Sequence, residues 1–576
     1  MREQLHGIAR VYHENRRGVL VASAFAVMAA VVEVVSIAMY YPVLAILTGT
    51  SIGGGVSSWL LTPLSRLLGA QPGLLALLTL LVALVATRAV CLYLARIVSN
   101  HYELLLNLRL KRTFLRRLAG SSWEFMLRAE PGSLLNVFSQ YTTSTSRALF
   151  CLVESIIDAV SCLAYLAFAI YVSPFFAVFV ILAGFVAGPV LRRIYWQIKA
   201  LVERNIRLRN DLANKFLDYF QGLKTFKSMS LEESYLREID RDVQCFTSNE
   251  QRSYRFQAGL NVLGEPLFAA ISASFLLVAY YGFDVAIETV VIFFALLSKS
   301  YSRLNGLQMN VGKLVISSAA VRFVEDFERR AAAASEAVAG RPLAGPITTV
   351  ELEDVRFAYP DGNEVFKGIS VRLDVQRGLI AVAGSSGAGK STLLDLLLGL
   401  LRPSAGTVRI NGIDLQEIDL PALRARVGFV PQRPVLFSRS IWENISLREE
   451  AETDLARVEE AAMLADAHAF ISRLSSGYAS VMGEDGASLS LGQIQRISIA
   501  RALYQRPEVL FVDEPTSALD PRAAAEVMCA IERVADSYPV FLVSHSAEAR
   551  RNARVALVVE DGTVRVTTPV GAGDAQ

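Results

Sequence analysis

Residues 384–391 read Gly-Ser-Ser-Gly-Ala-Gly-Lys-Ser, and they stand between the apolar run 379–383 and a helical pattern that starts at Thr392. This order predicts a phosphate-binding loop, because the glycines let successive backbone N–H groups face one point at the positive end of a helix. Lys390 is expected to reach the β- and γ-phosphates and Ser391 to bind Mg²⁺. The loop therefore predicts a site for a nucleoside triphosphate, formed by Gly384, Ser385, Ser386, Gly387, Ala388, Gly389, Lys390, Ser391 and Thr392.

The 576 residues are 53% hydrophobic with a mean hydropathy of +0.38, and the apolar excess lies before residue 300. At about 20 residues per span, the long apolar stretches predict membrane helices. There are six of them, at 18–48, 73–97, 148–172, 174–191, 258–281 and 284–300. Lys and Arg crowd the N-terminus and the segments 96–147 and 192–257, so both termini are expected in the cytoplasm, with the chain in the cytoplasmic membrane.

The apolar residues keep a helical spacing through these two basic segments, which predicts helices that extend from the membrane into the cytoplasm. The turns within them, near 123–136 and 218–230, are expected to contact the nucleotide domain. The net charge of +2 gives no reason to expect a nucleic-acid partner.

Strand and helix patterns alternate after residue 350, with strands expected at 350–357, 379–383, 408–410 and 508–512. The expected fold is an all-α membrane domain of six transmembrane helices with long cytoplasmic extensions, fused to an α/β P-loop ATPase domain. We assign residues 1–327 to the membrane domain, 328–346 to an Ala-, Gly- and Pro-rich linker, 347–566 to the nucleotide domain and 567–576 to a disordered tail.

An apolar strand, 509–512, ends in the acidic pair Asp513 and Glu514. A carboxylate at this place beside a phosphate loop is suited to hold Mg²⁺ through water, and its neighbour is suited to orient the attacking water. We expect Asp513 on the metal side and Glu514 as the general base.

With these two motifs, the chain resembles the ATP-binding cassette (ABC) transporters, and six spans before the cassette resemble the exporter type. The resemblance covers residues 350–565. It implies that ATP and Mg²⁺ bind, that Tyr359 stacks on adenine, that Gln432 of the Q-loop contacts the metal, and that His545 is the switch histidine with a catalytic role. The D-loop residue is Asp520, and the signature residues are Ser490, Gly492 and Gln493.

The signature reads Leu489-Ser490-Leu491-Gly492-Gln493, so Leu491 stands where the family usually has glycine. If φ is negative at Leu491, the backbone N–H persists and the cost is small. If φ is positive, the Cβ strains the turn. The competent site and the weakened half of an asymmetric pair both remain open at this point.

In the family, the signature of one cassette closes on the phosphate loop of another, so the resemblance implies a dimer of half-transporters, either two copies of this chain or this chain with a related one. The leading function is ATP-driven export or flipping of an amphipathic or lipid-like substrate. The alternatives are a multidrug or peptide exporter, and an ATP-gated channel or regulator that does not pump.

Charged residues within membrane spans are costly and are therefore candidates for function. Glu33, Arg88, Glu154 and Asp158 lie in or near the spans and are candidates for the wall of a substrate cavity. Glu154 and Asp158 share one helix face and are expected to pair with Arg88, and an interhelical ion pair without a transport role is the simpler interpretation. The amphipathic segment 57–68 and the first span weakly resemble flippases of lipid-linked oligosaccharides.

Overall fold

The computed structural model describes residues 16–48, 73–172, 174–282, 287–336, 340–359, 361–449, 452–482, 489–545 and 547–567. The described chain forms two compact units. The first comprises the chain up to Ser121 and Arg128–Ser335, and the second comprises Ser122–Leu127 and the chain from Glu336. The expected amphipathic segment 57–68 and most of the expected tail, 568–576, lie outside the described residues.

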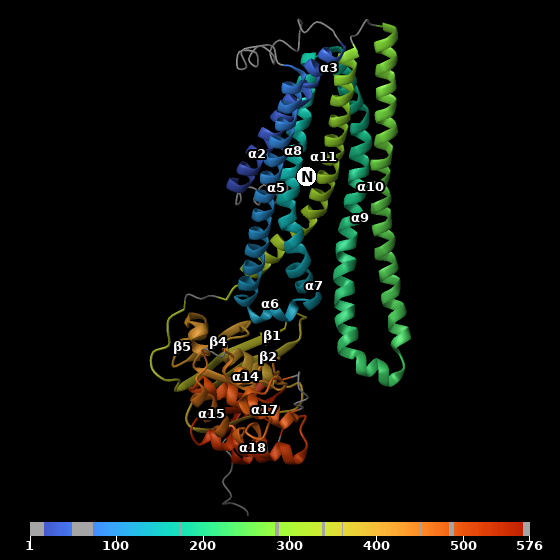
Figure 1. Ribbon diagram of the computed structural model, residues 1–576. Helices are drawn as coiled ribbons and strands as arrows, with labels where there is room; N and C mark the ends of the chain where they lie inside the picture. The colour runs from blue at the N-terminus through green and yellow to red at the C-terminus, as the bar shows by residue number, and fades with distance from the viewer. Residues whose placement is uncertain are drawn as a thin grey trace, which may run out of the picture. The chain divides into compact units, whose positions relative to one another are not determined.

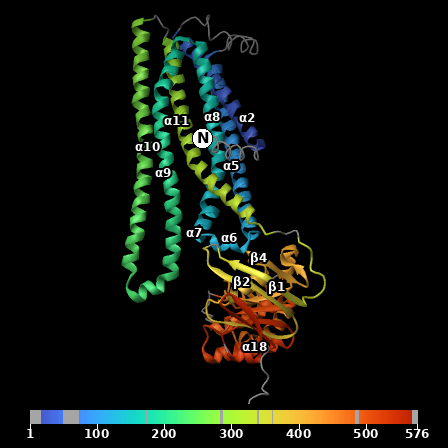
Figure 2. The ribbon, with the colours of Figure 1, turned by 180° about the vertical axis from the view of Figure 1, so that it is seen from behind.

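The first unit is helical. Its helices are α2 (Arg16–Ala38), α3 (Tyr40–Thr48), α5 (Leu74–Ala119), α7 (Pro131–Asn136), α8 (Thr142–Val172), α9 (Pro174–Met229), α10 (Glu232–Gly282) and α11 (Ile287–Ala333), with a π-helix η1 (Val137–Tyr141) between α7 and α8. Helices α2, α5, α8 and α11 pack together, and α9 and α10 lie side by side (Figures 1 and 2). The long helices α5, α9, α10 and α11 continue far beyond the apolar stretches, as the helical spacing predicted.

Close helix packing explains two glycines of this unit. A Cβ at Gly18 of α2 would lie 2.3 Å from the ring of Tyr102 in α5, and a Cβ at Gly306 of α11 would lie 2.7 Å from Asp158 Oδ2 in α8. Glycine therefore lets each pair of helices approach at these points.

Three candidate membrane spans stand out among the described residues by length and composition: Arg16–Leu44, Leu74–Ala119 and Pro131–Tyr171. The other expected spans lie in α9, α10 and α11, so the count of six remains a prediction. Helix α11 runs on to Ala333, into the range 328–346 that the composition assigned to a linker.

The second unit contains two sheets. The six-stranded sheet has the order β10-β9-β3-β8-β7-β6, and it is parallel except for the antiparallel edge strand β10. The four-stranded sheet, in the order β2-β1-β4-β5, is antiparallel. The strands are β1 (Thr349–Ala358), β2 (Glu364–Asp374), β3 (Gly378–Gly384), β4 (Ala405–Ile410), β5 (Ile413–Asp414), β6 (Val427–Val430), β7 (Val509–Asp513), β8 (Pro539–Val543), β9 (Val555–Glu560) and β10 (Thr563–Thr567). All four expected strands are confirmed.

The parallel sheet is buried on both faces, which is why its strands are continuously apolar. Phe511 and Phe541 face the core shared with the antiparallel sheet and α12 (Lys390–Leu397). Leu510 and Val512 face the opposite core. That second core is closed by helices that include α14 (Ile441–Ser446), α15 (Leu455–Leu464), α17 (Leu491–Tyr504) and α18 (Pro521–Ala535). The carboxyl ends of β3 and β7 thereby meet at one edge, where the predicted site residues lie.

Residues Ser122–Leu127, which make up most of α6 (Trp123–Arg128), cluster with the second unit. The backbone N–H of Arg402 donates to Glu124 Oε1 at 3.2 Å. This segment falls in the turn near 123–136 that was expected to contact the nucleotide domain. For the second turn, near 218–230, the expectation remains a prediction.

Candidate functional site

The phosphate loop connects β3 to α12, as predicted. Gly389 is the N-cap of α12 with φ at +98°, and a Cβ there would lie 2.4 Å from Val365 Cγ1. A Cβ at Gly384 would lie 2.3 Å from the carbonyl oxygen of Val559. Both positions therefore require glycine, which explains two of the three glycines of the loop. The loop's remaining members, Ser385, Ser386, Gly387 and Ala388, form the turn between them.

Lys390 is buried beneath this loop, at 5% exposure. Its Nζ donates to the carbonyl oxygen of Ser385 at 2.9 Å, and lies 3.2 Å from His545 Nε2 and 3.4 Å from Glu514 Oε1. A buried ammonium is costly unless it is paired, and these contacts supply the pairing. The same geometry places a fixed positive charge where the loop would hold phosphates.

Ser391 and Asp513 lie together, as the metal-site prediction requires. The Ser391 hydroxyl donates to Asp513 Oδ1 at 3.2 Å. Burial raises the pKa of Asp513 even though the Ser391 hydrogen bond lowers it. Burial and the charge of Asp513 also raise the pKa of Asp395 in α12 to about 6. A hydroxyl and a buried carboxylate are oxygen ligands of the kind Mg²⁺ prefers. A bound cation would also stabilise the charged forms of the neighbouring Asp513 and Asp395. The residues therefore fit the metal.

Glu514 is the point where the separate motifs meet. Its Oε1 lies 2.9 Å from His545 Nε2, and its Oε2 accepts from Gln432 Nε2 at 2.9 Å. Its φ is +38°, an unfavourable value for a residue with a side chain, and its N–H donates to the carbonyl oxygen of Val543 at 3.1 Å. Strain of this kind is found where the surrounding structure fixes a functional residue. Three loops distant in sequence thus position one carboxylate.

Tyr359 follows β1 at the edge of the site. Its hydroxyl lies 3.0 Å from Thr392 Oγ1 in the first turn of α12, and its ring meets that of Phe357 edge to face at 5.0 Å. The structure therefore fixes the ring of Tyr359 beside the phosphate loop. Stacking on adenine remains a prediction.

The signature residues begin α17. Ser490 is the N-cap: its N–H donates to Gln493 Oε1 at 2.9 Å, and its hydroxyl accepts from the N–H of Gln493 at 3.3 Å. Leu491 is the first helical residue and has a negative φ, so the unstrained alternative holds. Its side chain is 41% exposed. Gly492 is buried, and a Cβ there would lie 3.0 Å from Ala523 Cβ, which explains this glycine.

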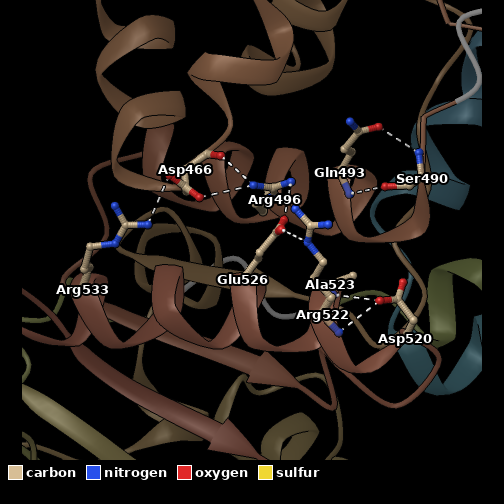
Figure 3. A network of polar contacts seen from close by, with 9 residues as sticks. All are labelled: Asp466, Ser490, Gln493, Arg496, Asp520, Arg522, Ala523, Glu526 and Arg533. Atoms are coloured by element: carbon tan, nitrogen blue, oxygen red, sulfur yellow. Dashed lines mark hydrogen bonds and ion pairs between the residues drawn. The ribbon is translucent and has the colours of Figure 1, made fainter.

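Asp520 caps α18 in the same way, since its Oδ1 accepts from the N–H groups of Arg522 and Ala523 at 3.1 and 3.0 Å. The signature and the D-loop therefore each begin a helix with a side-chain cap. Figure 3 shows these two caps and the ion pairs that lie between the helices.

Arg496 joins the two helices, and no sequence motif marks it. From α17 its guanidinium lies 3.2 Å from Asp466 Oδ2 and 3.3 Å from Glu526 Oε2 of α18 (Figure 3). It also lies over the ring of Phe470, 5.1 Å from the centroid. Its side chain is only 13% exposed. Arg533 of α18 pairs with the same Asp466 at 3.2 Å, so the network ties α18 to the segment after α15.

The charged residues of the helical unit form interhelical ion pairs. Glu33 of α2 is buried and lies 2.8 Å from Arg88 of α5 and 3.2 Å from Arg303 of α11. Arg303 also lies 3.2 Å from Asp158 of α8. The simpler of the two interpretations of these residues therefore describes the observed contacts.

The expected pairing of Glu154 and Asp158 with Arg88 is wrong. Arg88 extends from α5 to α2, and Glu154 accepts instead from Arg96 Nε at 3.2 Å. The partner of Asp158 is instead Arg303, which follows the last apolar stretch by three residues and is therefore not marked as a charge within a span.

Comparisons with known proteins agree with this geometry. The family model described as "ABC transporter" matches residues 367–517. Residues 367–517 of the chain are therefore similar to the ABC transporter family. In fold, the chain is similar to a solved bacterial Atm1-family ABC exporter, with a TM-score of 0.78 over 96% of this chain and 95% of that one at 23% identity.

Curated relatives match parts of the chain. ABC transporter B family member 1 of Arabidopsis thaliana is 41% identical over 217 residues, which are 37% of this chain and 17% of that protein. The ATP-dependent lipid A-core flippase of Saccharophagus degradans is 30% identical over 387 residues, which are 66% of this chain and 63% of that protein. The chain thus spans less than two thirds of the length of these relatives.

Proposed function

We propose that this chain is an ABC transporter that hydrolyses ATP at the site around Glu514 and uses the cycle to export or flip an amphipathic or lipid-like molecule across the cytoplasmic membrane. The observation that carries the proposal is the meeting of Lys390, Gln432, Glu514 and His545 within hydrogen-bond or ion-pair distance. A pump needs such a constellation, whereas a regulator that only binds ATP does not need a base.

In the proposed reaction, Lys390 and the N–H groups of the loop bind the phosphates. Glu514 is the general base and accepts a proton from the attacking water, while Gln432 and His545 hold the two carboxylate oxygens in place. Ser391 and Asp513 would hold Mg²⁺, which neutralises developing phosphate charge when it is bound. Tyr359 beside the loop is suited to contact the base of the nucleotide.

The proposal includes a dimer. Ser490 and Leu491 lie at the exposed start of α17, where a second cassette would meet them, and the cap of Ser490 keeps the first turn ordered before that encounter. The likeness in fold to an exporter supports the same assembly. The partner is a second copy of this chain or a related half-transporter, and both cassettes face the cytoplasm.

The substrate class rests on the helical unit and on the relatives. A relative named as a lipid A-core flippase and others named as multidrug resistance proteins favour an amphipathic cargo. The network of Glu33, Arg88, Asp158 and Arg303 stabilises the helices. Arg88 keeps 23% of its side chain exposed beside its ion pair with Glu33, and we propose that it attracts an anionic group of the substrate.

The test is Glu514→Gln in the full-length protein reconstituted in lipid. This variant removes the base while keeping the size of the side chain, so ATP hydrolysis should fall by at least about 100-fold while ATP still binds. Glu364→Gln, which changes an exposed glutamate of β2, is the matched control and should hydrolyse normally. Normal hydrolysis in Glu514→Gln would refute the catalytic assignment.

Transport is tested separately in sealed vesicles, by following ATP-dependent movement of a fluorescent lipid between leaflets. Movement that stops in Glu514→Gln supports the flippase. ATP hydrolysis that proceeds without movement of lipids, drugs or peptides would favour the alternative of an ATP-gated channel or regulator.

A further inference from the structure

A cavity with a volume of about 540 Å³ lies within the helical unit, between η1, α8, α9, α10 and α11. Its lining includes Tyr141, Asn205, Arg209, Glu250, Gln251 and Arg255. A cavity of this size admits an organic molecule rather than a few waters. None of its lining residues belongs to the nucleotide site or to the ion network of Glu33.

We propose that this cavity binds a small organic anion that carries hydroxyl groups. The proposal rests on the proposed function only in placing the cavity on the cytoplasmic side. The apolar stretch of α9 ends at residue 191, and Asn205 lies about 20 Å further along the helix axis. At that depth the ligand is the water-soluble part of a molecule and not an acyl chain.

The first observation is an unpaired polar group. Asn205 is 8% exposed, and its Oδ1 has no hydrogen-bond partner among the described residues. A buried acceptor without a partner is destabilising, and such groups in native proteins are explained by a ligand, an ion or a water. A hydroxyl group of a ligand in the cavity would satisfy it.

The second observation is the balance of charge. Arg209 and Arg255 line the cavity with one acid, Glu250, and Glu250 Oε1 is 3.7 Å from Arg209 Nη2. Arg209 also donates to Gln140 Oε1 and lies over the ring of Phe246. The lining therefore carries a net positive charge, which Arg255 supplies on an exposed side chain. Arginine in such a position favours a phosphate or a carboxylate.

The third observation is the backbone of the wall. Tyr141 ends the π-helix η1, and π-helical turns are rare and are frequently found at functional sites. The Tyr141 hydroxyl donates to Asn210 Oδ1 at 2.7 Å, and Asn136 Nδ2 donates to the same oxygen at 2.9 Å. These hydrogen bonds attach η1 to α9, and they fix the wall before a ligand enters.

The required chemistry is an anionic group with nearby hydroxyls, and it has two sources: a free solute such as a sugar phosphate, or the head group of a lipid. We test both with the full-length protein in nucleotide-free nanodiscs, by titration calorimetry. Glucose 6-phosphate represents the solute, and dihexanoylphosphatidylglycerol below its micelle concentration represents the lipid. Glucose and inorganic phosphate, which each carry half of the chemistry, should bind at least about tenfold more weakly.

Two variants locate the binding. Arg255→Gln removes the exposed charge and Asn205→Leu removes the buried acceptor, and each should weaken binding by about tenfold or more. Arg252→Gln removes the same charge from α10 at an exposed residue that does not line the cavity, so it should bind normally. Asn205→Leu should also keep or raise the Tm, because it removes an unpaired buried group. A merely structural asparagine would instead lower the Tm.

Binding of glucose 6-phosphate assigns the site to a solute, and binding of the phospholipid alone assigns it to a lipid head group. Failure of both probes to bind overturns the proposal, and so does equal loss of binding in Arg252→Gln and Arg255→Gln. Because no ATP is present, the outcome is independent of the hydrolysis test on Glu514.

Discussion

Two half-exposed leucines at opposite ends of helices offer a direct test of the signature's conformation. Leu491 begins α17 with a negative φ and is 41% exposed. Leu447 follows α14 with φ at +55° and is 50% exposed. Replacing either leucine by glycine removes a similar amount of buried side chain. The difference between the free energies of unfolding of the two variants therefore reports mainly on the backbone conformation.

The expected magnitude follows from the two values of φ. A left-handed residue with a side chain costs about 1–2 kcal/mol, which Leu447→Gly relieves. Glycine within a helix costs about 0.5–1 kcal/mol, which Leu491→Gly incurs. The free energies of unfolding of the two variants should therefore differ by about 2 kcal/mol. For a domain of this size that is about 4–8 °C in Tm, with Leu447→Gly the more stable.

The assay is thermal unfolding of the full-length protein, followed by ATP hydrolysis of the same samples. Hydrolysis in Leu491→Gly should stay within about threefold of the unchanged protein, because the N–H groups of the turn are already in place. If Leu491→Gly were as stable as Leu447→Gly, the negative φ would be refuted. A tenfold rise in hydrolysis would show that the Leu491 side chain hinders closure of the site.

Three further outcomes follow. In a double-mutant cycle, Arg496→Met and Glu526→Gln should show a coupling of about 0.5–1 kcal/mol in unfolding, since the pair is partly exposed, and additive effects would argue against the link between α17 and α18. The pKa of Asp395 is raised from 3.8 to about 6, so the folded protein holds this proton more tightly than the unfolded chain does. Without Mg²⁺ the protein should therefore lose stability as the pH rises from about 4 to 6, and melting curves of Asp395→Asn should show a smaller loss. Asp513→Asn should weaken ATP binding in Mg²⁺ but not in EDTA, as measured with a fluorescent ATP analogue.

The sequence predicts the nucleotide domain well because its signals are local. A glycine-rich loop after a buried strand and an acidic pair at the end of another specify where the backbone turns, and the parallel sheet then brings Ser391 and Asp513 together. Even Leu491 is interpretable, because the residues around it form a capping box that fixes a helical start.

The missed contacts depend on which helices become neighbours. Nothing local marks Arg496, since its partners Asp466 and Glu526 are 30 residues before it and 30 after it. Arg303 likewise has no local signal, because its acidic partners Glu33 and Asp158 lie on α2 and α8. Asn205 gives no signal in the sequence at all, because an unpaired amide is recognised only when its surroundings are known.

The ion network around Glu33 also constrains how this chain can diverge. Glu33 contacts Arg88 and Arg303, and Lys299 Nζ lies 3.8 Å away, so three cations of two other helices share this one carboxylate. Losing Glu33 alone would leave uncompensated positive charge among apolar helices. Related chains that lack this glutamate should therefore also lack Arg88 or Arg303, so that the inheritance of these positions is linked across α2, α5 and α11.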